Sequence, residues 1–304
     1  MKDVVIVGAG PAGMAAGIYA GRARFDTIIF DKGIPGGQIL LTDWIENYPG
    51  FHEGIIPVQL IENFRKQLEK FGVKIKMAEV KKIFKHNNAW KIIAGEEEHS
   101  ARSVILTPGS SYKRLGVEGE SRLTGKGVSY CATCDAPFFK EKDVGVVGGG
   151  DNSLTEAIYL TKFCRKVYII HRRDRFRGEK ILHERVLENP LIEVLWDTVV
   201  DKISGEMKLE SVQLKNVKTK SVSKLELAGL FIAIGMMPNT SFLQGLVDID
   251  ENGRIKVGKQ MNTSQHGIFA AGDVTDACPS QIATSVGTGV IAALAVTDYI
   301  TDLT

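Results

Sequence analysis

The 304-residue chain carries 38 basic and 36 acidic side chains, a near balance that excludes the strong positive field with which proteins attract nucleic acids or membranes. Hydrophobic residues make up 44% and charged residues 24%, which is ordinary for a globular protein of about two domains. Residues 1–3 lead into an apolar run without signal-peptide features, and no uninterrupted apolar stretch reaches the roughly 18 residues of a spanning helix. We therefore expect a cytoplasmic protein with no membrane and no nucleic-acid partner.

The first predicted unit is a strand, a glycine-rich turn, a helix and a second strand. Residues 4–7 are typical of a buried parallel strand, and residues 11–22 fit a helix. The Gly-x-Gly-x-x-Gly turn at 8–13 would let backbone N–H groups and the helix N-terminus approach a pyrophosphate. Such a turn alone is weak evidence, but the second strand at 27–30 ends at Asp31, whose carboxylate can accept hydrogen bonds from ribose hydroxyls. This pattern indicates a site for FAD or NAD.

Two stretches rich in strand-forming residues each follow a predicted nucleotide-binding unit, the first unit described above and a second one at residues 143–170. We expect antiparallel β segments at residues 73–93 and 192–225. Their turns should lie near residues 85–88 and 204–206, where asparagine, glycine and serine gather.

A single Cys-x-x-Cys pair precedes the second glycine cluster. Cys131 and Cys134 can close a small disulfide, and the adjacent Asp135 is placed to move protons. A structural zinc site or an iron–sulfur cluster would require further ligands, but Cys164 and Cys278 stand alone. An inactive buried pair remains a minor alternative. The pair indicates intracellular redox chemistry, and no metal site is expected.

The second predicted unit repeats the first with a different ending. A strand at 143–147, a Gly-x-Gly-x-x-Ser turn at 148–153, a helix at 152–163 and a strand at 166–170 lead to His171-Arg172-Arg173. No carboxylate occupies the place of Asp31, and guanidinium groups suit a phosphate dianion. A solvated charged face is the alternative, but the position at the end of a Rossmann strand favours an NADP(H) site.

The C-terminal stretch is predicted to return to the first domain. Residues 267–273 form a short apolar strand closed by Asp273, and the helix at 281–299 could direct its N-terminus at a flavin. Short turn-rich crossings at 110–116 and 235–240 would connect the domains. The predicted fold is α/β, with two Rossmann-like three-layer nucleotide-binding domains. The FAD domain comprises residues 1–112 and 241–304, and the inserted NADPH domain, residues 113–240, carries the cysteine pair.

Motifs along nearly the whole chain resemble those of the low-molecular-weight thioredoxin reductases, which are FAD-dependent pyridine nucleotide-disulfide oxidoreductases. The matching segments are Gly8-Ala9-Gly10-Pro11-Ala12-Gly13, Gly36-Gly37-Gln38, Glu46-Asn47-Tyr48-Pro49-Gly50, Cys131-Ala132-Thr133-Cys134-Asp135, Gly148-Gly149-Gly150-Asp151-Asn152-Ser153, His171-Arg172-Arg173-Asp174 and Ala270-Ala271-Gly272-Asp273-Val274. The resemblance implies a homodimer that holds FAD, takes electrons from NADPH and passes them to thioredoxin or a thioredoxin-like protein. It also implies two domain orientations, one for each half of the reaction.

The same resemblance implies a role for each matched residue. Cys134 would face the flavin, Cys131 would attack the partner disulfide, and Asp135 would act as acid and base. FAD would be bound by Gly8, Gly10, Pro11, Ala12, Gly13, Asp31, Lys32, Gly37, Gln38, Asn47, Val80, Gly109, Gly272, Asp273, Gln281 and Ile282. NADPH would be bound by Gly150, Asn152, Ser153, His171, Arg172, Arg173, Arg177, Ile234 and Gly235, with the arginines on the 2′-phosphate.

The chain departs from the family pattern in three places. Thr107-Pro108-Gly109 stands where Ala-Thr-Gly is usual, so that Pro108 removes a backbone donor, and Asp31 replaces the commoner Glu. Ser280 and Ile282 stand where Arg and Ala are usual, which affects contacts near the flavin and the nicotinamide.

Other functions fit the residues less well. A related flavoenzyme could serve a glutaredoxin-like protein or a peroxiredoxin, or could oxidise a small dithiol with oxygen. A flavin ferredoxin/NADP reductase lacks the Cys-x-x-Cys, and a nucleotide sensor that is not an enzyme would leave the cysteines unexplained.

Overall fold

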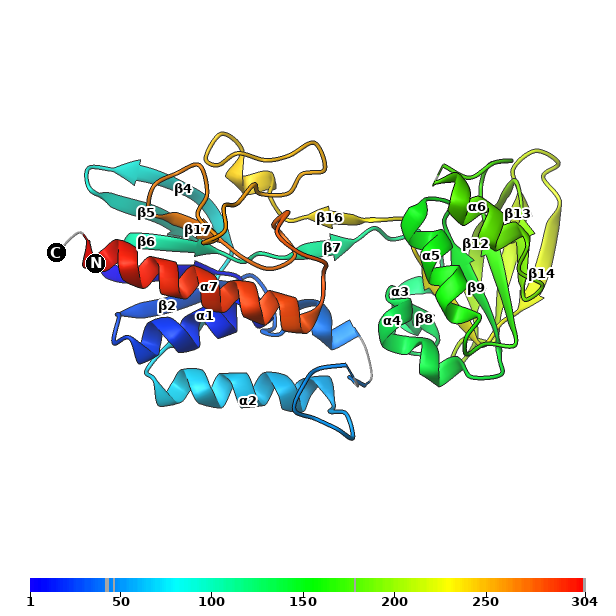
Figure 1. Ribbon diagram of the computed structural model, residues 1–304, viewed down its shortest axis with the longest axis horizontal. Coiled ribbons are helices and arrows are strands. Elements are labelled where there is room, and N and C mark those ends of the chain that lie inside the picture. The colour runs from blue at the N-terminus through cyan, green and yellow to red at the C-terminus, as the bar shows by residue number, and fades with distance from the viewer. Residues whose placement is uncertain (42–43, 46, 178, 303–304) are drawn as a thin grey trace. The chain divides into compact units, whose positions relative to one another are not determined.

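The computed structural model describes residues 1–41, 44–45, 47–177 and 179–302, which divide into two compact units (Figure 1). Unit 1 comprises Met1–Leu40, Tyr48–Ser111 and Met237–Thr304, and unit 2 comprises Leu41–Asn47 and Tyr112–Met236. Two of the passages between the units run along β7 (Ser110–Tyr112) and β16 (Met236–Pro238), which pair as a two-stranded sheet.

Unit 1 is built on one mixed sheet. Its strands are β1 (Lys2–Val7), β2 (Thr27–Asp31), β3 (Lys74–Met77), β4 (Val80–His86), β5 (Ala89–Ala94), β6 (Glu97–Leu106) and β17 (Ile268–Ala270). The order is β3-β2-β1-β6-β5-β4, and β17 also pairs with β6. Pairing is parallel from β3 to β6 and at β17, and antiparallel among β4, β5 and β6. Residues Val4, Val5 and Ile6 are fully buried, as expected for a parallel strand covered on both faces.

The expectation of antiparallel pairing from residue 73 onward is wrong at its start. β3 pairs in parallel with β2, because α2 (Pro57–Lys70) supplies the long crossover that parallel strands require. Helix α2 was not predicted from the sequence. β4 and β5 are antiparallel, and the chain reverses between them at Asn87, whose φ is +51°.

Helix α1 (Pro11–Arg22) packs against α2 and α7 (Ile282–Thr301) on the sheet of unit 1 (Figure 1). A Cβ at Gly289 of α7 would press into the carbonyl of Ala12, so the two helices cross with backbones in close approach. Among the described helices, α7 is long and apolar enough to cross a membrane by length and composition alone. Core helices also meet that criterion, and Ala292, Ala293 and Val296 of α7 are buried against unit 1.

Unit 2 combines a parallel sheet with a three-stranded antiparallel sheet. The parallel sheet has the order β11-β10-β9-β15-β8, from β8 (Val128–Ser129), β9 (Asp143–Val147), β10 (Lys166–Ile170), β11 (Ile192–Leu195) and β15 (Gly229–Ile232). The second sheet is β12 (Thr198–Ser204), β13 (Ser211–Asn216) and β14 (Val222–Glu226). The prediction of antiparallel pairing over 192–225 is therefore wrong for β11, which pairs in parallel with β10, and right for the rest.

Two hydrophobic cores hold unit 2 together, one on each face of its parallel sheet. Val144 and Val146 of β9 face one core with α5 (Asp151–Leu160) and α6 (Lys180–Leu187), whereas Val147 faces the other core with β12 and β13. The side-chain alternation of a strand explains this division. Helix α5 ends at Leu160, three residues before the predicted end, and the following turn buries Cys164 in the first of these cores.

Candidate redox site and nucleotide cradles

The first glycine turn forms a cradle of backbone groups at the N-terminus of α1. Gly8 has a φ of +108°, and a Cβ there would press into the carbonyl of Thr107. A Cβ at Gly13 would meet the carbonyl oxygen of Gly8, so strand and helix touch at this point. At Gly10, the N-cap of α1, nothing lies within 4 Å of the place where a Cβ would be. The backbone is therefore open where N–H groups and the helix dipole would hold a pyrophosphate.

Asp31 at the end of β2 is oriented by two backbone donors. The N–H of Ala9 donates to Oδ2 at 2.6 Å, and the N–H of Gly33 donates to Oδ1 at 2.9 Å. Each carboxylate oxygen can accept a further bond, so the group is fixed beside the glycine turn and can still accept hydrogen bonds from a ribose. The neighbouring Lys32 is exposed.

Gln38 carries a buried acceptor that suits a ligand. Its Nε2 donates to the carbonyl of Ser110 at 3.0 Å, but its buried Oε1 has no donor among the described residues. Because an unmatched buried acceptor costs free energy, a ligand N–H at this place would be favoured. A Cβ at Gly37 would lie 3.6 Å from Gly10 Cα, so this segment borders the first glycine turn.

Asp273 lies in unit 1 between β17 and the start of α7. Ser285 Oγ donates to its Oδ1 at 3.0 Å. Burial raises the pKa of Asp273 above its ordinary value, and the hydrogen bond from Ser285 opposes that effect only in part. Gln281 is the N-cap of α7 and Ile282 its first residue, so the positive end of the helix dipole lies near this acid in the chain.

The structure brings most of the other residues predicted for FAD into unit 1. Gly272 has a φ of +79°, and Gly109 has a φ of +64° with nothing within 4 Å of a Cβ position. Val80 is buried at the start of β4. Asn47 differs from them, because it is exposed and groups with unit 2.

Cys131 and Cys134 form a disulfide, as the Cys-x-x-Cys spacing predicts, with their Cα atoms 5.4 Å apart. Cys131 is the N-cap of the short helix α4 (Ala132–Asp135). Burial raises the pKa of the Cys164 thiol to about 11, which keeps that thiol protonated and unreactive. Across the described residues, no group of three or more His, Cys, Asp or Glu side chains could hold a metal ion.

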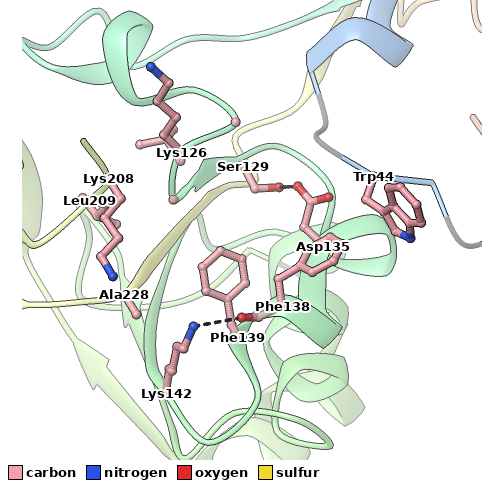
Figure 2. A pocket seen from close by; sticks show the side chains of 13 residues that line it. Trp44, Lys126, Ser129, Asp135, Phe138, Phe139, Lys142, Lys208, Leu209 and Ala228 are labelled. Atoms are coloured by element: carbon pink, nitrogen blue, oxygen red, sulfur yellow. Dashed lines mark hydrogen bonds between the residues drawn. The ribbon is translucent and has the colours of Figure 1, made fainter. Parts of the chain in front are cut away.

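Asp135 borders a pocket of about 330 Å³ in unit 2 (Figure 2). Ser129 Oγ donates to Asp135 Oδ2 at 2.6 Å and accepts the N–H of Cys131 at 3.1 Å. The lining side chains include Trp44, Lys126, Ser129, Asp135, Phe138, Phe139, Lys142, Lys208 and Leu209. Ser129 was not predicted from the sequence, because one serine before a cysteine pair carries no pattern of its own.

The second glycine turn repeats the cradle in unit 2. Gly150 is the N-cap of α5, and nothing lies within 4 Å of a Cβ position there. Ser153, at the position of the third glycine, donates to the Gly150 carbonyl at 2.8 Å and accepts the Gly150 N–H at 3.0 Å. Asn152 is exposed, and its Nδ2 donates to Glu156 at 3.2 Å. The turn is therefore held by its own serine, and its outer backbone stays open for a pyrophosphate.

The basic residues predicted for the 2′-phosphate side of NADPH comprise one buried ring and three exposed cations. His171 is 4% exposed, its Nε2 lies 2.9 Å from the Arg175 carbonyl, and burial lowers its pKa. A Cβ at Gly149 would press into the His171 ring, so this ring packs directly against the glycine turn. The cations are on Arg172, Arg173 and Arg177, which are exposed and form no ion pair with a carboxylate among the described residues.

Two further predicted residues lie at the end of β15. Ile234 follows the strand, and Gly235 has a φ of +105°. The carbonyl of Gly235 accepts the N–H of Lys113 at 2.9 Å, which joins the two connecting segments within unit 2.

Comparisons with known proteins agree along nearly the full length. Residues 2–289 match the pyridine nucleotide-disulphide oxidoreductase family. Thioredoxin reductases of Mycolicibacterium smegmatis and Bacillus subtilis are each 42% identical, over 97% and 99% of this chain and 95% of their own lengths. The crystal structure of thioredoxin reductase from Streptococcus pyogenes matches with a TM-score of 0.95 at 42% identity, covering 99% of both chains.

These relatives confirm the predicted α/β fold with two Rossmann-type domains. The chain belongs to the low-molecular-weight thioredoxin reductases of the pyridine nucleotide-disulphide oxidoreductase family, which is the family that its motifs predict.

Proposed function

We propose that this protein is an NADPH-dependent thioredoxin reductase. The observation that carries the proposal is the Cys131–Cys134 disulfide, which lies in a unit that also holds an open glycine cradle and exposed arginines with no ion pair in the described part of the chain. In the overall reaction, NADPH and one proton reduce the disulfide of thioredoxin to two thiols and leave NADP⁺. FAD, when bound, supplies a two-electron relay between the nicotinamide and the cysteine pair.

Unit 1 is proposed to hold FAD, with residues 1–112 and 241–304 as the FAD domain. The backbone of the first glycine turn would bind the pyrophosphate, and Asp31 would accept the ribose hydroxyls. Gln38 Oε1, buried without a donor among the described residues, suits an N–H of the ligand. Asp273 and the N-terminus of α7 would line the same cofactor.

Unit 2 is proposed to bind NADPH, with residues 113–240 as the NADPH domain. The N-terminus of α5 would hold the pyrophosphate, and Arg172, Arg173 and Arg177 would hold the 2′-phosphate. His171 would contribute indirectly, because its buried ring packs against the glycine turn that would bind the pyrophosphate.

The cysteines are proposed to divide the exchange between them. After reduction, the thiolate of Cys131 attacks the thioredoxin disulfide and forms a mixed disulfide, and the first thioredoxin sulfur leaves as a thiolate. The Cys134 thiol then gives its proton to Asp135 while its sulfur attacks Cys131. The Cys131–Cys134 bond re-forms, the second thioredoxin sulfur leaves as a thiolate, and Asp135 passes the proton to it.

A cytoplasmic homodimer is proposed for the assembled enzyme. Helix α7 carries Ile291 and Leu294 with 40% and 52% of their surface exposed, and burial of such apolar residues favours association. Light scattering should give twice the mass of the chain, and a single-chain mass would contradict the dimer.

Loss of Cys134 should separate the two halves of the reaction. We expect Cys134→Ser to retain FAD and to be bleached by NADPH, because neither step uses the disulfide. Thioredoxin reduction should fall at least about 100-fold, since the pair can no longer re-form. The control is Cys278→Ser, which removes the half-buried thiol and should leave turnover unchanged. Retained turnover in Cys134→Ser would remove the pair from the mechanism.

Oxidised glutaredoxin-like and peroxiredoxin proteins, used as substrates in the same assay, test whether thioredoxin is the preferred partner.

Coenzyme preference should depend on the exposed arginines. In the double variant Arg172→Ala/Arg173→Ala we expect the KM for NADPH to rise about 10- to 100-fold, because two charge-assisted contacts to the 2′-phosphate are lost. The KM for NADH, which lacks that phosphate, should stay nearly constant. Arg185→Ala, which removes an exposed arginine of α6, is the control. An equal rise for both coenzymes would contradict the phosphate assignment.

A further inference from the structure

Ser129 connects the acid of the redox site to the backbone of the cysteine pair. It ends β8 and is only 5% exposed. Figure 2 shows its hydroxyl directed at Asp135, where Oγ donates to Oδ2 at 2.6 Å. The same oxygen accepts the N–H of Cys131 at 3.1 Å. A hydroxyl has one proton and two acceptor sites, so both bonds can form at once.

The length of the Ser129–Asp135 bond lies in the range of charge-assisted O–H···O⁻ bonds, which are about 2.5–2.7 Å. Three cationic side chains, those of Lys126, Lys142 and Lys208, line the pocket that Asp135 borders. The bond from Ser129 holds the Asp135 carboxylate in one orientation among them.

Ser129 lies in a closely packed part of unit 2, because β8 pairs with β15 and places Ser129 opposite the buried Phe231. Phe139, which lines the pocket, packs edge-on against the buried Phe231, with ring centroids 5.3 Å apart. Lys142 Nζ donates to the carbonyl of Phe138 at 3.1 Å (Figure 2). The hydroxyl of Ser129 therefore projects from the end of β8 within a densely packed region.

We propose that Ser129 is a positioning residue that holds the Asp135 carboxyl in place for proton transfer during thiol–disulfide exchange. This inference rests on the proposed function. When the bond between Cys131 and the partner sulfur breaks and the Cys131–Cys134 bond forms, the partner sulfur leaves with the electron pair. Asp135 takes the thiol proton of Cys134 as that sulfur attacks and gives it to the departing thiolate, and Ser129 keeps the acid beside the cysteine pair by binding Oδ2 and the Cys131 N–H together.

A double-mutant cycle tests whether Ser129 acts through Asp135. We expect Ser129→Ala to slow thioredoxin reduction about 10- to 100-fold, the rate equivalent of losing a hydrogen bond to a charged group. In an Asp135→Asn background, the same serine change should alter the rate less than about two-fold, because the acid is already absent. Ser129→Thr keeps the hydroxyl and should recover most of the rate. Bleaching of the flavin by NADPH should be the same in every variant.

The matched control is Ser211→Ala on β13, since Ser211 is also 5% exposed in unit 2 and does not line the pocket. It should leave turnover unchanged. An equal loss from Ser129→Ala with and without Asp135 would overturn the proposal, as would full activity of Asp135→Asn.

A second assay keeps this test separate from the proposed function. Variants in a Cys278→Ser background are reduced with dithiothreitol, freed of it, and reacted with oxidised glutathione, which needs neither NADPH nor FAD. The Ser129 variants should show the same pattern in this exchange as in turnover. A wild-type protein that fails to reduce any disulfide protein with NADPH would contradict the proposed function, whereas additive losses in the glutathione assay would contradict the role of Ser129.

Discussion

Glu156 on α5 is a partly buried acid next to α4, the short helix that carries Cys134. Its Oε1 accepts Asn152 Nδ2 at 3.2 Å, and its buried Oε2 finds no donor among the described residues. Burial raises its pKa from 4.5 to about 7, against smaller opposing effects from Asn152 and from the backbone N–H of Ala132. Because Ala132 lies between the two cysteines, the Glu156 carboxyl adjoins the redox pair.

The raised pKa of Glu156 should make stability fall as the pH rises. Below about pH 4.5 the acid is protonated in both states, so it has no effect on the free energy of unfolding. Between pH 4.5 and 7 the unfolded chain loses the proton first, and the folded state is penalised by roughly 3 kcal/mol above pH 7. We expect Glu156→Gln to raise the melting temperature at pH 8 by more than at pH 5.

The control for this prediction is Glu184→Gln, an exposed acid on α6. Its effect should be small at both pH values. A melting temperature of Glu156→Gln that differs from the wild type by the same amount at pH 5 and pH 8 would contradict a protonated Glu156 in the folded protein.

Residues that belong to a spaced motif could be predicted from the sequence, whereas residues that act through folded contacts could not. The Cys-x-x-Cys spacing predicts the disulfide between Cys131 and Cys134, which the structure contains. Ser129 and Glu156 reach the cysteine pair only when a strand end and a helix are packed against it, and no spacing in the chain records that packing.

At the scale of elements, helices α1 and α7 of unit 1 cross with their backbones in close contact. A Cβ at Gly289 would press into the Ala12 carbonyl, whereas a Cβ at Gly287 on the same helix has nothing within 4 Å. We expect Gly289→Ala to lower the free energy of unfolding by about 1–3 kcal/mol, because the helices must move apart. It should also weaken FAD retention, since Ala12 belongs to the proposed cradle.

Gly287→Ala is the matched control, because both substitutions add the same methyl group to the same helix. At the exposed position the change should raise stability by up to about 1 kcal/mol through helix propensity. Urea unfolding of both variants measures the difference. Equal midpoints would show that the helix crossing tolerates a side chain.

Elements with a strong local pattern could be predicted. The direction in which a strand pairs with its neighbour could not. The helix predicted at 11–22 agrees with α1, which begins at a proline suited to the first helical turn. Strands β3 and β11 were expected to be antiparallel, because strand patterns say nothing about direction. Their parallel pairing follows from the crossovers before them, and the amphipathic helix α2 was the missing signal for β3.

For the whole molecule, the repeated glycine turns predicted two nucleotide units, and the structure shows two compact units with separate cores. No local pattern indicates that Leu41–Asn47 groups with unit 2, because that segment lies between elements of unit 1 in the chain. Grouping of this kind depends on contacts between distant residues, which local patterns do not encode.

Separate cores predict that thermal unfolding of the flavin-free protein shows two transitions in calorimetry. Ile92→Ala, in the core of unit 1, and Leu160→Ala, in a core of unit 2, each remove a fully buried side chain and identify which transition belongs to which unit. FAD at about 100 times its Kd should stabilise the transition that Ile92→Ala lowers by about 2.7 kcal/mol, and NADP⁺ should stabilise the other by a similar amount. A shift of the unit 1 transition by NADP⁺ would contradict the assignment of the two nucleotides, whereas one joint transition would show that the units unfold together.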